Sequence, residues 1–191
     1  MRSYINIALL SGLLALATNS SIKAQTDIFS DDSVKISFFS SAPLEDISAK
    51  NNMAKAILDA SSGEIAVLVR IERFEFRKRL MQKHFNEQYM ESDKYPEATF
   101  NGRIVDFNVE DLNNEAIDYQ VKGTLSLHGI EKEFSGTAQI SGNENQVNGK
   151  TEFYVMLDDY DIKRPRMLIK NIAERIRVNI DMNLQKRDEQ N

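Results

Sequence analysis

Few side chains in this sequence are of the types that perform catalysis or bind metals, and their spacing assembles no reaction centre. Cysteine is absent, which excludes a thiolate nucleophile, a thiolate metal site and any disulfide. The two histidines, His84 and His128, lie far apart, and neither has a second histidine or a carboxylate at metal-ligand spacing. His84 fits either a hydrogen-bonded interior histidine, the more common case, or a ligand-binding residue or base. We therefore predict no catalytic residues and no metal site, and a protein that is not an enzyme.

The densest acidic cluster is Asp158-Asp159-Tyr160-Asp161. It lacks the alternating oxygen ligands, the glycine and the closing glutamate of a calcium-binding loop. Aspartates in this arrangement favour a solvated hairpin bend in which their side chains accept backbone hydrogen bonds. The sequence also has no glycine-rich phosphate loop and no nucleophile elbow, so we expect no cofactor.

The amino-terminal residues have the order of a secretory signal peptide. Arg2 supplies a positive start, residues 5–17 are largely apolar, and a short polar stretch ends at Ala24, where we predict cleavage. The apolar run is too short to span a bilayer comfortably and no second one follows it, so we predict no transmembrane segment. The predicted organisation is a signal peptide over 1–24, a single domain over 25–184 and a polar tail over 185–191.

The charge of the chain excludes one class of partner. The 24 Lys and Arg residues are outnumbered by 29 Asp and Glu residues, which gives a formal net charge of −5. The predicted signal peptide holds two of the basic residues and none of the acidic ones, so the mature charge becomes −7. Nucleic acid binding needs a basic surface, and the only basic cluster is Arg77-Lys78-Arg79. We therefore exclude nucleic acid as a partner.

One segment, 77–90, has the spacing of an amphipathic helix. Tyr95-Pro96 prevents any helix from continuing into the next segment. The predicted stripe is largely apolar and must pack on the strands beside it. Either the helix only caps the end of a sheet or barrel, or it also forms one wall of a ligand cavity. The members of the stripe are Leu80, Met81, His84, Phe85, Gln88 and Tyr89.

Most of the remaining sequence alternates apolar and polar residues, as half-buried strands do. The clearest rows lie within 65–71, 117–127, 134–140, 147–157 and 176–184, and weaker ones within 33–40, 45–51 and 53–59. Short turns separate them, and the last strand lacks the inward charges that blunt an exposed sheet edge. We therefore predict an all-β fold, an antiparallel barrel of about eight strands with one amphipathic helix packed at the barrel.

Small residues interrupt the apolar rows of several predicted strands. Inward glycines either mark bends at barrel corners or leave volume near the axis, and the pattern leaves both readings open. A barrel of about eight strands is near the size that holds one small or elongated ligand. The small residues are Gly102, Gly123, Gly136, Ala138 and Gly149.

Four short motifs follow one another in a fixed order. They are His84-Phe85 with Tyr89-Met90, then Lys94-Tyr95-Pro96-Glu97-Ala98-Thr99-Phe100, then Gly123-Thr124-Leu125-Ser126-Leu127-His128-Gly129, and finally Asp159-Tyr160-Asp161-Ile162. Together they resemble the bacterial YceI-like family of lipocalin-like proteins over essentially the whole mature chain. The family often has glycine where this chain has Asp161, and paired phenylalanines in place of Tyr89-Met90. A methionine there would widen and soften the pocket.

The resemblance implies a periplasmic or secreted, lipocalin-like barrel with a long apolar tunnel. We expect an exported protein that sequesters or carries a long-chain apolar lipid, such as a polyisoprenoid or isoprenoid quinone. The alternative is a ligand-free barrel that acts in envelope stress or protein interaction, and the oligomeric state is open between a monomer and a homodimer. His84 and Tyr89 would meet a polar head group that reaches the helix. The predicted lining residues are Val67, Val69, Met81, His84, Phe85, Tyr89, Phe100, Tyr119, Val121, Phe134, Phe153 and Val178.

Overall fold

The computed structural model describes residues 27–41, 46–163 and 173–187, so the predicted signal peptide lies outside the described residues. This part of the chain forms nine strands, one α-helix and four short turns of other helical types. The strands are β1 (Ile28–Ser40), β2 (Ile47–Asp59), β3 (Glu64–Arg70), β4 (Glu75–Phe76), β5 (Glu97–Ile104), β6 (Ile117–Leu127), β7 (Ile130–Asn143), β8 (Gln146–Met156) and β9 (Arg175–Lys186). The helix is α1 (Arg79–His84), followed by the π-helical turn η2 (Phe85–Tyr89), and the 3-10 turns are η1 (Ile71–Arg73), η3 (Val109–Asp111) and η4 (Leu157–Tyr160).

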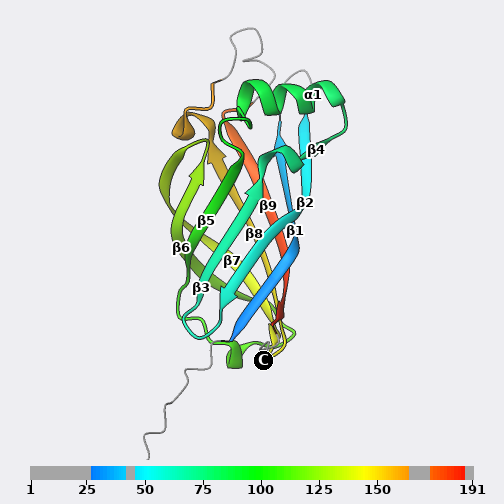
Figure 1. Ribbon diagram of the computed structural model, residues 1–191. Helices are drawn as coiled ribbons and strands as arrows, with labels where there is room; N and C mark the ends of the chain where they lie inside the picture. Colours follow the sequence, from blue (N-terminus) through cyan, green and yellow to red (C-terminus); the bar gives the residue numbers. More distant parts are fainter. Residues whose placement is uncertain (1–26, 42–45, 164–172, 188–191) are drawn as a thin grey trace, which may run out of the picture.

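Eight of the strands form a closed antiparallel barrel, which confirms the predicted fold. In hydrogen-bonding order, β1 is followed by β9, β8, β7, β6, β5, β3 and β2, and β2 pairs back with β1. The two-residue strand β4 is an extra strand that pairs with β2. The strands run obliquely to the long axis, and α1 lies across one end, which we call the upper end (Figure 1).

The first two strands are longer and more continuous than their sequence pattern predicted. β1 begins at Ile28 rather than Ser33, and the single strand β2 replaces the two segments predicted within 45–59. The pairing of β1 with β2 shifts register on both sides of Val34. Each shift interrupts the alternation of inward and outward side chains, so the pattern is weak in this part of the sequence.

The helix predicted over 77–90 is formed by α1 and η2, and only part of its predicted stripe faces the barrel. Met81 and Phe85 border the interior of the barrel, whereas Leu80 is 63% exposed and Gln88 also lies in solvent. A short helix that lies across the end of a barrel contacts it along a narrow line. The outer members of the stripe therefore stay in water.

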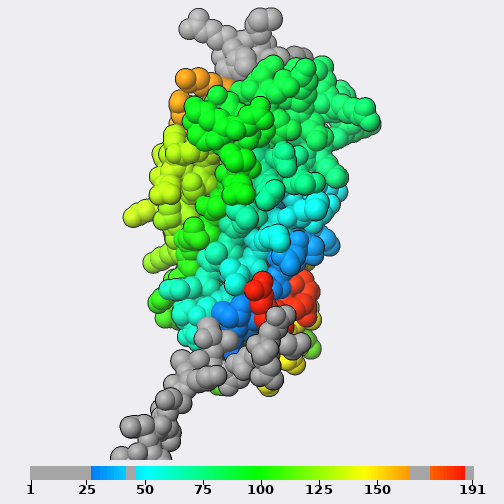
Figure 2. All heavy atoms as spheres, in the orientation of Figure 1, coloured from blue at the N-terminus to red at the C-terminus, as the bar shows by residue number. Residues whose placement is uncertain are grey.

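The lower part of the barrel is filled by side chains. The most completely buried apolar residues there are Phe29, Val34, Leu58, Val147 and Leu184, each at most 1% exposed. The wall over β3 and β5 is closed by side chains in the space-filling view (Figure 2). β9 runs to Lys186, two residues beyond the predicted end of the domain. None of the described helices is long or apolar enough to cross a membrane.

Candidate functional site

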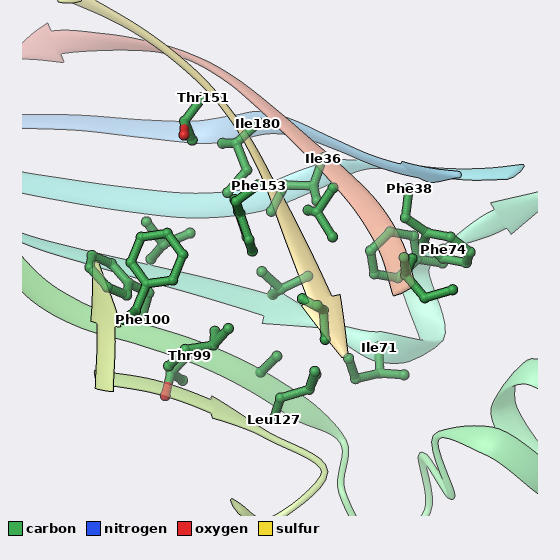
Figure 3. Close-up of a pocket in the computed structure, with 18 of the residues that line it drawn as sticks. Ile36, Phe38, Ile71, Phe74, Thr99, Phe100, Leu127, Thr151, Phe153 and Ile180 are labelled. Carbon is green, nitrogen blue, oxygen red and sulfur yellow. The ribbon is translucent and has the colours of Figure 1, made fainter. Parts of the chain in front are cut away.

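Between the filled lower part and the helix, the barrel encloses a cavity of about 480 Å³. Small-molecule binding sites typically have volumes of roughly 300–1,000 Å³. Figure 3 shows Phe100 and Phe153 on one side of the cavity and Phe38 and Phe74 on the other, with aliphatic side chains between them. All eight barrel strands contribute side chains to the lining, so the cavity lies along the axis of the barrel.

Eleven of the twelve predicted lining residues border this cavity, and Tyr119 does not. The ring of Tyr119 packs edge-on against Phe107, with 5.8 Å between the ring centres. Alternation places Tyr119 on the inward face of β6, where its ring packs against Phe107 and the core rather than on the cavity. A binding role for the other eleven stays a prediction. They are Val67, Val69, Met81, His84, Phe85, Tyr89, Phe100, Val121, Phe134, Phe153 and Val178.

Four phenylalanines hold the helix onto the barrel, and the prediction included only one of them. The ring of Phe85 lies 5.5 Å from that of Phe38, 5.6 Å from that of Phe74 and 5.0 Å from that of Phe76. Aromatic pairs at such separations contribute about 0.5–1.5 kcal/mol beyond area burial. The Phe-Glu-Phe sequence before the helix was the available signal for Phe74 and Phe76. Further cavity residues outside the prediction include Ile36, Ile71, Leu125, Leu127, Ala138, Ile176 and Ile180.

Three of the inward glycines accommodate a ring or a neighbouring strand, whereas Gly149 borders the cavity. A side chain at Gly102 would meet the Phe100 ring at 2.4 Å, and one at Gly136 would meet the Phe134 ring at 2.8 Å. Each of these rings folds back over the glycine two residues further along its own strand. Gly123 is paired with Gly102, and a Cβ atom there would lie 2.3 Å from a backbone oxygen of β5. Gly102, Gly123 and Gly136 therefore permit close approach of a ring or a strand.

Few polar groups reach the cavity. Thr99 and Thr151 lie at its edge, and the Thr151 hydroxyl donates a hydrogen bond of 2.8 Å to the backbone carbonyl of Thr137 (Figure 3). From the helix, His84 and Tyr89 also border the cavity. Burial raises the pKa of the Tyr89 phenol, so this group stays protonated at neutral pH and can donate a hydrogen bond. Among the described residues, no three potential metal-ligating side chains gather in one place.

His128 and the acidic cluster meet outside the cavity. The buried imidazole of His128 lies within hydrogen-bonding distance of the Tyr160 carbonyl and of the Glu91 carboxylate. The acidic cluster forms the 3-10 turn η4, and no side-chain hydrogen bond caps it, which corrects the predicted bend with aspartate caps. Burial, and then the charge of Asp159, raises the pKa of the Tyr160 phenol. Neither His128 nor the aspartates line the cavity, and only Leu157, the first residue of the turn η4, borders it.

Comparisons with known proteins agree with this architecture. The family model described as the YceI-like domain matches residues 18–184. Among curated proteins, none matches the sequence.

Three solved structures resemble the fold. A polyisoprenoid-binding domain from Saccharophagus degradans implicated in plant cell wall breakdown is 13% identical, with a TM-score of 0.73 over 85% of this chain and 100% of that one. BcnA of Burkholderia cenocepacia is 13% identical, with a TM-score of 0.65 over 79% of this chain and 95% of that one. The YceI protein of Campylobacter jejuni is 15% identical, with a TM-score of 0.52 over 99% of this chain and 100% of that one. At these identities the similarity shows the fold, whereas the family match spans most of the sequence: the chain belongs to the YceI-like family.

Proposed function

We propose that this protein binds and carries a long-chain apolar lipid, of the polyisoprenoid or isoprenoid quinone class, inside its barrel. The observation that carries the proposal is the axial cavity, with its almost entirely aliphatic and aromatic lining. Each buried CH₂ group contributes about 0.8 kcal/mol gross. A hydrocarbon chain therefore gains affinity with length, before ordering costs, and needs no charged contact with the wall.

The family supports the same class of ligand. The similar domain from Saccharophagus degradans is described as polyisoprenoid-binding, and this chain shares its fold. The predicted signal peptide supports an exported protein, periplasmic or secreted, which would meet lipids at the cell envelope. The cavity favours this carrier over a ligand-free barrel that acts in envelope stress or protein interaction. A barrel that only presents its outer surface has no need of an apolar interior volume.

Two measurements test the proposal. Organic extraction of protein purified from its own host, followed by mass spectrometry, should recover an isoprenoid lipid in near-stoichiometric amount. Delipidated protein should take up N-phenyl-1-naphthylamine, a neutral fluorophore that brightens in apolar surroundings, and geranylgeraniol should displace it. Geranylgeraniol should also raise the melting temperature, because a ligand that binds only the native state stabilises it. Protein that yields no lipid and admits neither probe would contradict the proposed function.

A further inference from the structure

The barrel wall is incomplete between β7 and β8. Their ladder has five rungs, from Asn143–Gln146 up to Gln139–Lys150, and no described rung joins residues 130–138 of β7 to residues 151–156 of β8. On their other sides both strands stay paired over this height, β7 with β6 up to its first residue and β8 with β9 up to Met156. We call this unpaired stretch the seam.

Side-chain contacts replace the missing ladder across the seam. The Thr151 hydroxyl donates to the Thr137 carbonyl at 2.8 Å. Higher up, Lys132 Nζ lies 2.7 Å from Asp159 Oδ1, with the two side chains 42% and 50% exposed. Exposed ion pairs of this kind contribute little stability. The contacts across the seam are therefore weaker than the continuous ladders on either side of it, between β6 and β7 and between β8 and β9.

The seam separates the cavity from solvent by the thickness of one layer of side chains. Phe134 and Phe153 lie on its two sides, 5.0 Å apart between ring centres, and both line the cavity. Outside, a polar groove crosses β1, β9, β8 and β7 where the ladder ends. Four residues line both this groove and the cavity: Lys150 and Thr151 at the foot of the seam, and Ile36 and Ile180 on the adjoining strands β1 and β9. The interior and the exterior surfaces thus meet at the foot of the seam.

The described residues at the two ends of the barrel are held more firmly. In the lower part, Phe29, Leu58 and Leu184 are at most 1% exposed, and Leu184 also borders the cavity. At the upper end, the rings of Phe38 and Phe85 stack within the four-phenylalanine cluster that anchors the helix. Opening either end would expose apolar surface. Opening the seam also exposes the rings of Phe134 and Phe153, but among the described contacts it breaks only one hydrogen bond, one exposed ion pair and one aromatic contact.

We propose that the seam is the entrance through which the apolar ligand reaches the cavity. The two strands part between Phe134 and Phe153, the hydrocarbon chain slides in, and its polar end stays near Gln139 and Lys150 in the outer groove. This inference rests on the proposed function, since it concerns the route of the same lipid. It goes beyond the proposed function because a ligand in the axial cavity could also have entered from one end of the barrel.

A covalent tether across the seam tests the route, and the absence of native cysteine makes the chain suitable for it. Lys132→Cys with Asp159→Cys places one thiol on each side, and a short bifunctional thiol reagent joins them. The matched control joins Lys122→Cys to Ser135→Cys, a regular rung between β6 and β7. Uptake of N-phenyl-1-naphthylamine by delipidated protein is followed by stopped-flow fluorescence before and after linking, with circular dichroism as the check on folding.

The uptake rate should fall by about an order of magnitude or more in the seam-linked protein, because the tether removes the open state that admits the probe. The control link should leave the rate unchanged. Equal rates before and after seam linking overturn the entrance while leaving the proposed function intact. If the unlinked protein takes up no probe at all, the proposed function fails and the entrance fails with it.

A second variant does not depend on linking. Thr151→Val keeps the shape of the side chain and removes the hydrogen bond to the Thr137 carbonyl. The uptake rate should rise about two- to tenfold, which is the effect of one net hydrogen bond on the opening equilibrium. Thr124→Val on the outer side of β6 is the control and should have no effect. A rate unchanged or lowered by Thr151→Val contradicts the seam as the entrance.

Discussion

The imidazole of His128 donates a hydrogen bond of 2.9 Å from Nδ1 to the backbone carbonyl of Tyr160. Its Nε2 atom lies 3.1 Å from Glu91 Oε2, and the ring of Tyr95 packs 4.5 Å from its own. His128 is 7% exposed, although it stands at the tip of the hairpin between β6 and β7. One side chain thus ties this hairpin to the turn after β8 and to the segment after the helix.

The first prediction concerns this tie. His128 and Gly129 have φ values of 52° and 76°, so asparagine at 128 suits the turn while removing the imidazole. His128→Asn should lower the free energy of unfolding by about 1–3 kcal/mol, because the buried Tyr160 carbonyl loses its partner. Urea unfolding measures this change. His84→Asn is the control and should change stability by only a few tenths of a kcal/mol, as for a partly exposed side chain. Equal losses for the two variants would contradict the structural role of His128.

The sequence predicted which faces of the strands point inward, because alternation is a local property. The inward row of β9, from Ile176 through Val178 and Ile180, lines the cavity as the pattern indicated. Tyr119 shows the limit of the same reasoning. Its face was assigned correctly, but its ring packs against Phe107 instead of the cavity. Which rings meet in the interior is set by the tertiary fold, which alternation does not encode.

The role of His128 was hidden for a related reason. A His-Gly dipeptide predicts a turn, but its partners Tyr160 and Glu91 belong to distant segments that come together only in the fold. The packing of rings over glycines can, in contrast, be predicted from a sequence pattern. The pattern Phe-x-Gly occurs at Phe100–Gly102 and at Phe134–Gly136, and in each pair the ring covers the glycine. Such a repeat in strands indicates a ring packed over a glycine rather than an empty volume.

The second prediction concerns the turn at the end of η4. Asp161 has a φ of 51°, in the left-handed region that favours glycine, and glycine is the residue that the family often has there. Asp161→Gly should be neutral or raise the free energy of unfolding by up to about 1 kcal/mol, because it relieves strain of about that size. Asp161→Val should lower it by more than about 1 kcal/mol, since a β-branched residue fits this region poorly. Equal melting temperatures for the valine and glycine variants would contradict the left-handed backbone conformation at Asp161.

The third prediction tests the two faces of the final strand. Ile180 lines the cavity, whereas Asp181 lies outside with its carboxylate 3.5 Å from Lys150 Nζ. Ile180→Asp should prevent folding or lower stability by several kcal/mol, because a charge would face an apolar wall without a partner. Asp181→Asn should change stability by only a few tenths of a kcal/mol, as expected for an exposed ion pair. Similar melting temperatures for the two variants would show that the faces are assigned incorrectly.

The last prediction asks whether the cavity is the volume that a ligand fills. Ala138 lies on β7 with its side chain on the cavity wall and is 8% exposed. In a cavity, the ring of Ala138→Phe occupies the space of the ligand, so the protein should stay folded while its capacity for N-phenyl-1-naphthylamine falls sharply. In a solid core the same ring would overpack and cost roughly 1–3 kcal/mol or more. Alanine avoids the risk of altering a glycine with special backbone angles.

The matched control is Gln120→Phe, which places the same ring on the outer face of the neighbouring strand β6. It should leave both the melting temperature and the capacity for the probe close to those of the parent, because an exposed side chain occupies no interior volume. A folded Ala138→Phe protein with undiminished capacity would show that the ligand does not pass this part of β7. Strong destabilisation of Ala138→Phe, in a parent that takes up no probe, would instead favour a barrel whose interior is packed in solution. We expect a folded Ala138→Phe variant that no longer binds the probe and a Gln120→Phe control that binds it as the parent does. Only a barrel with an accessible interior can give both results.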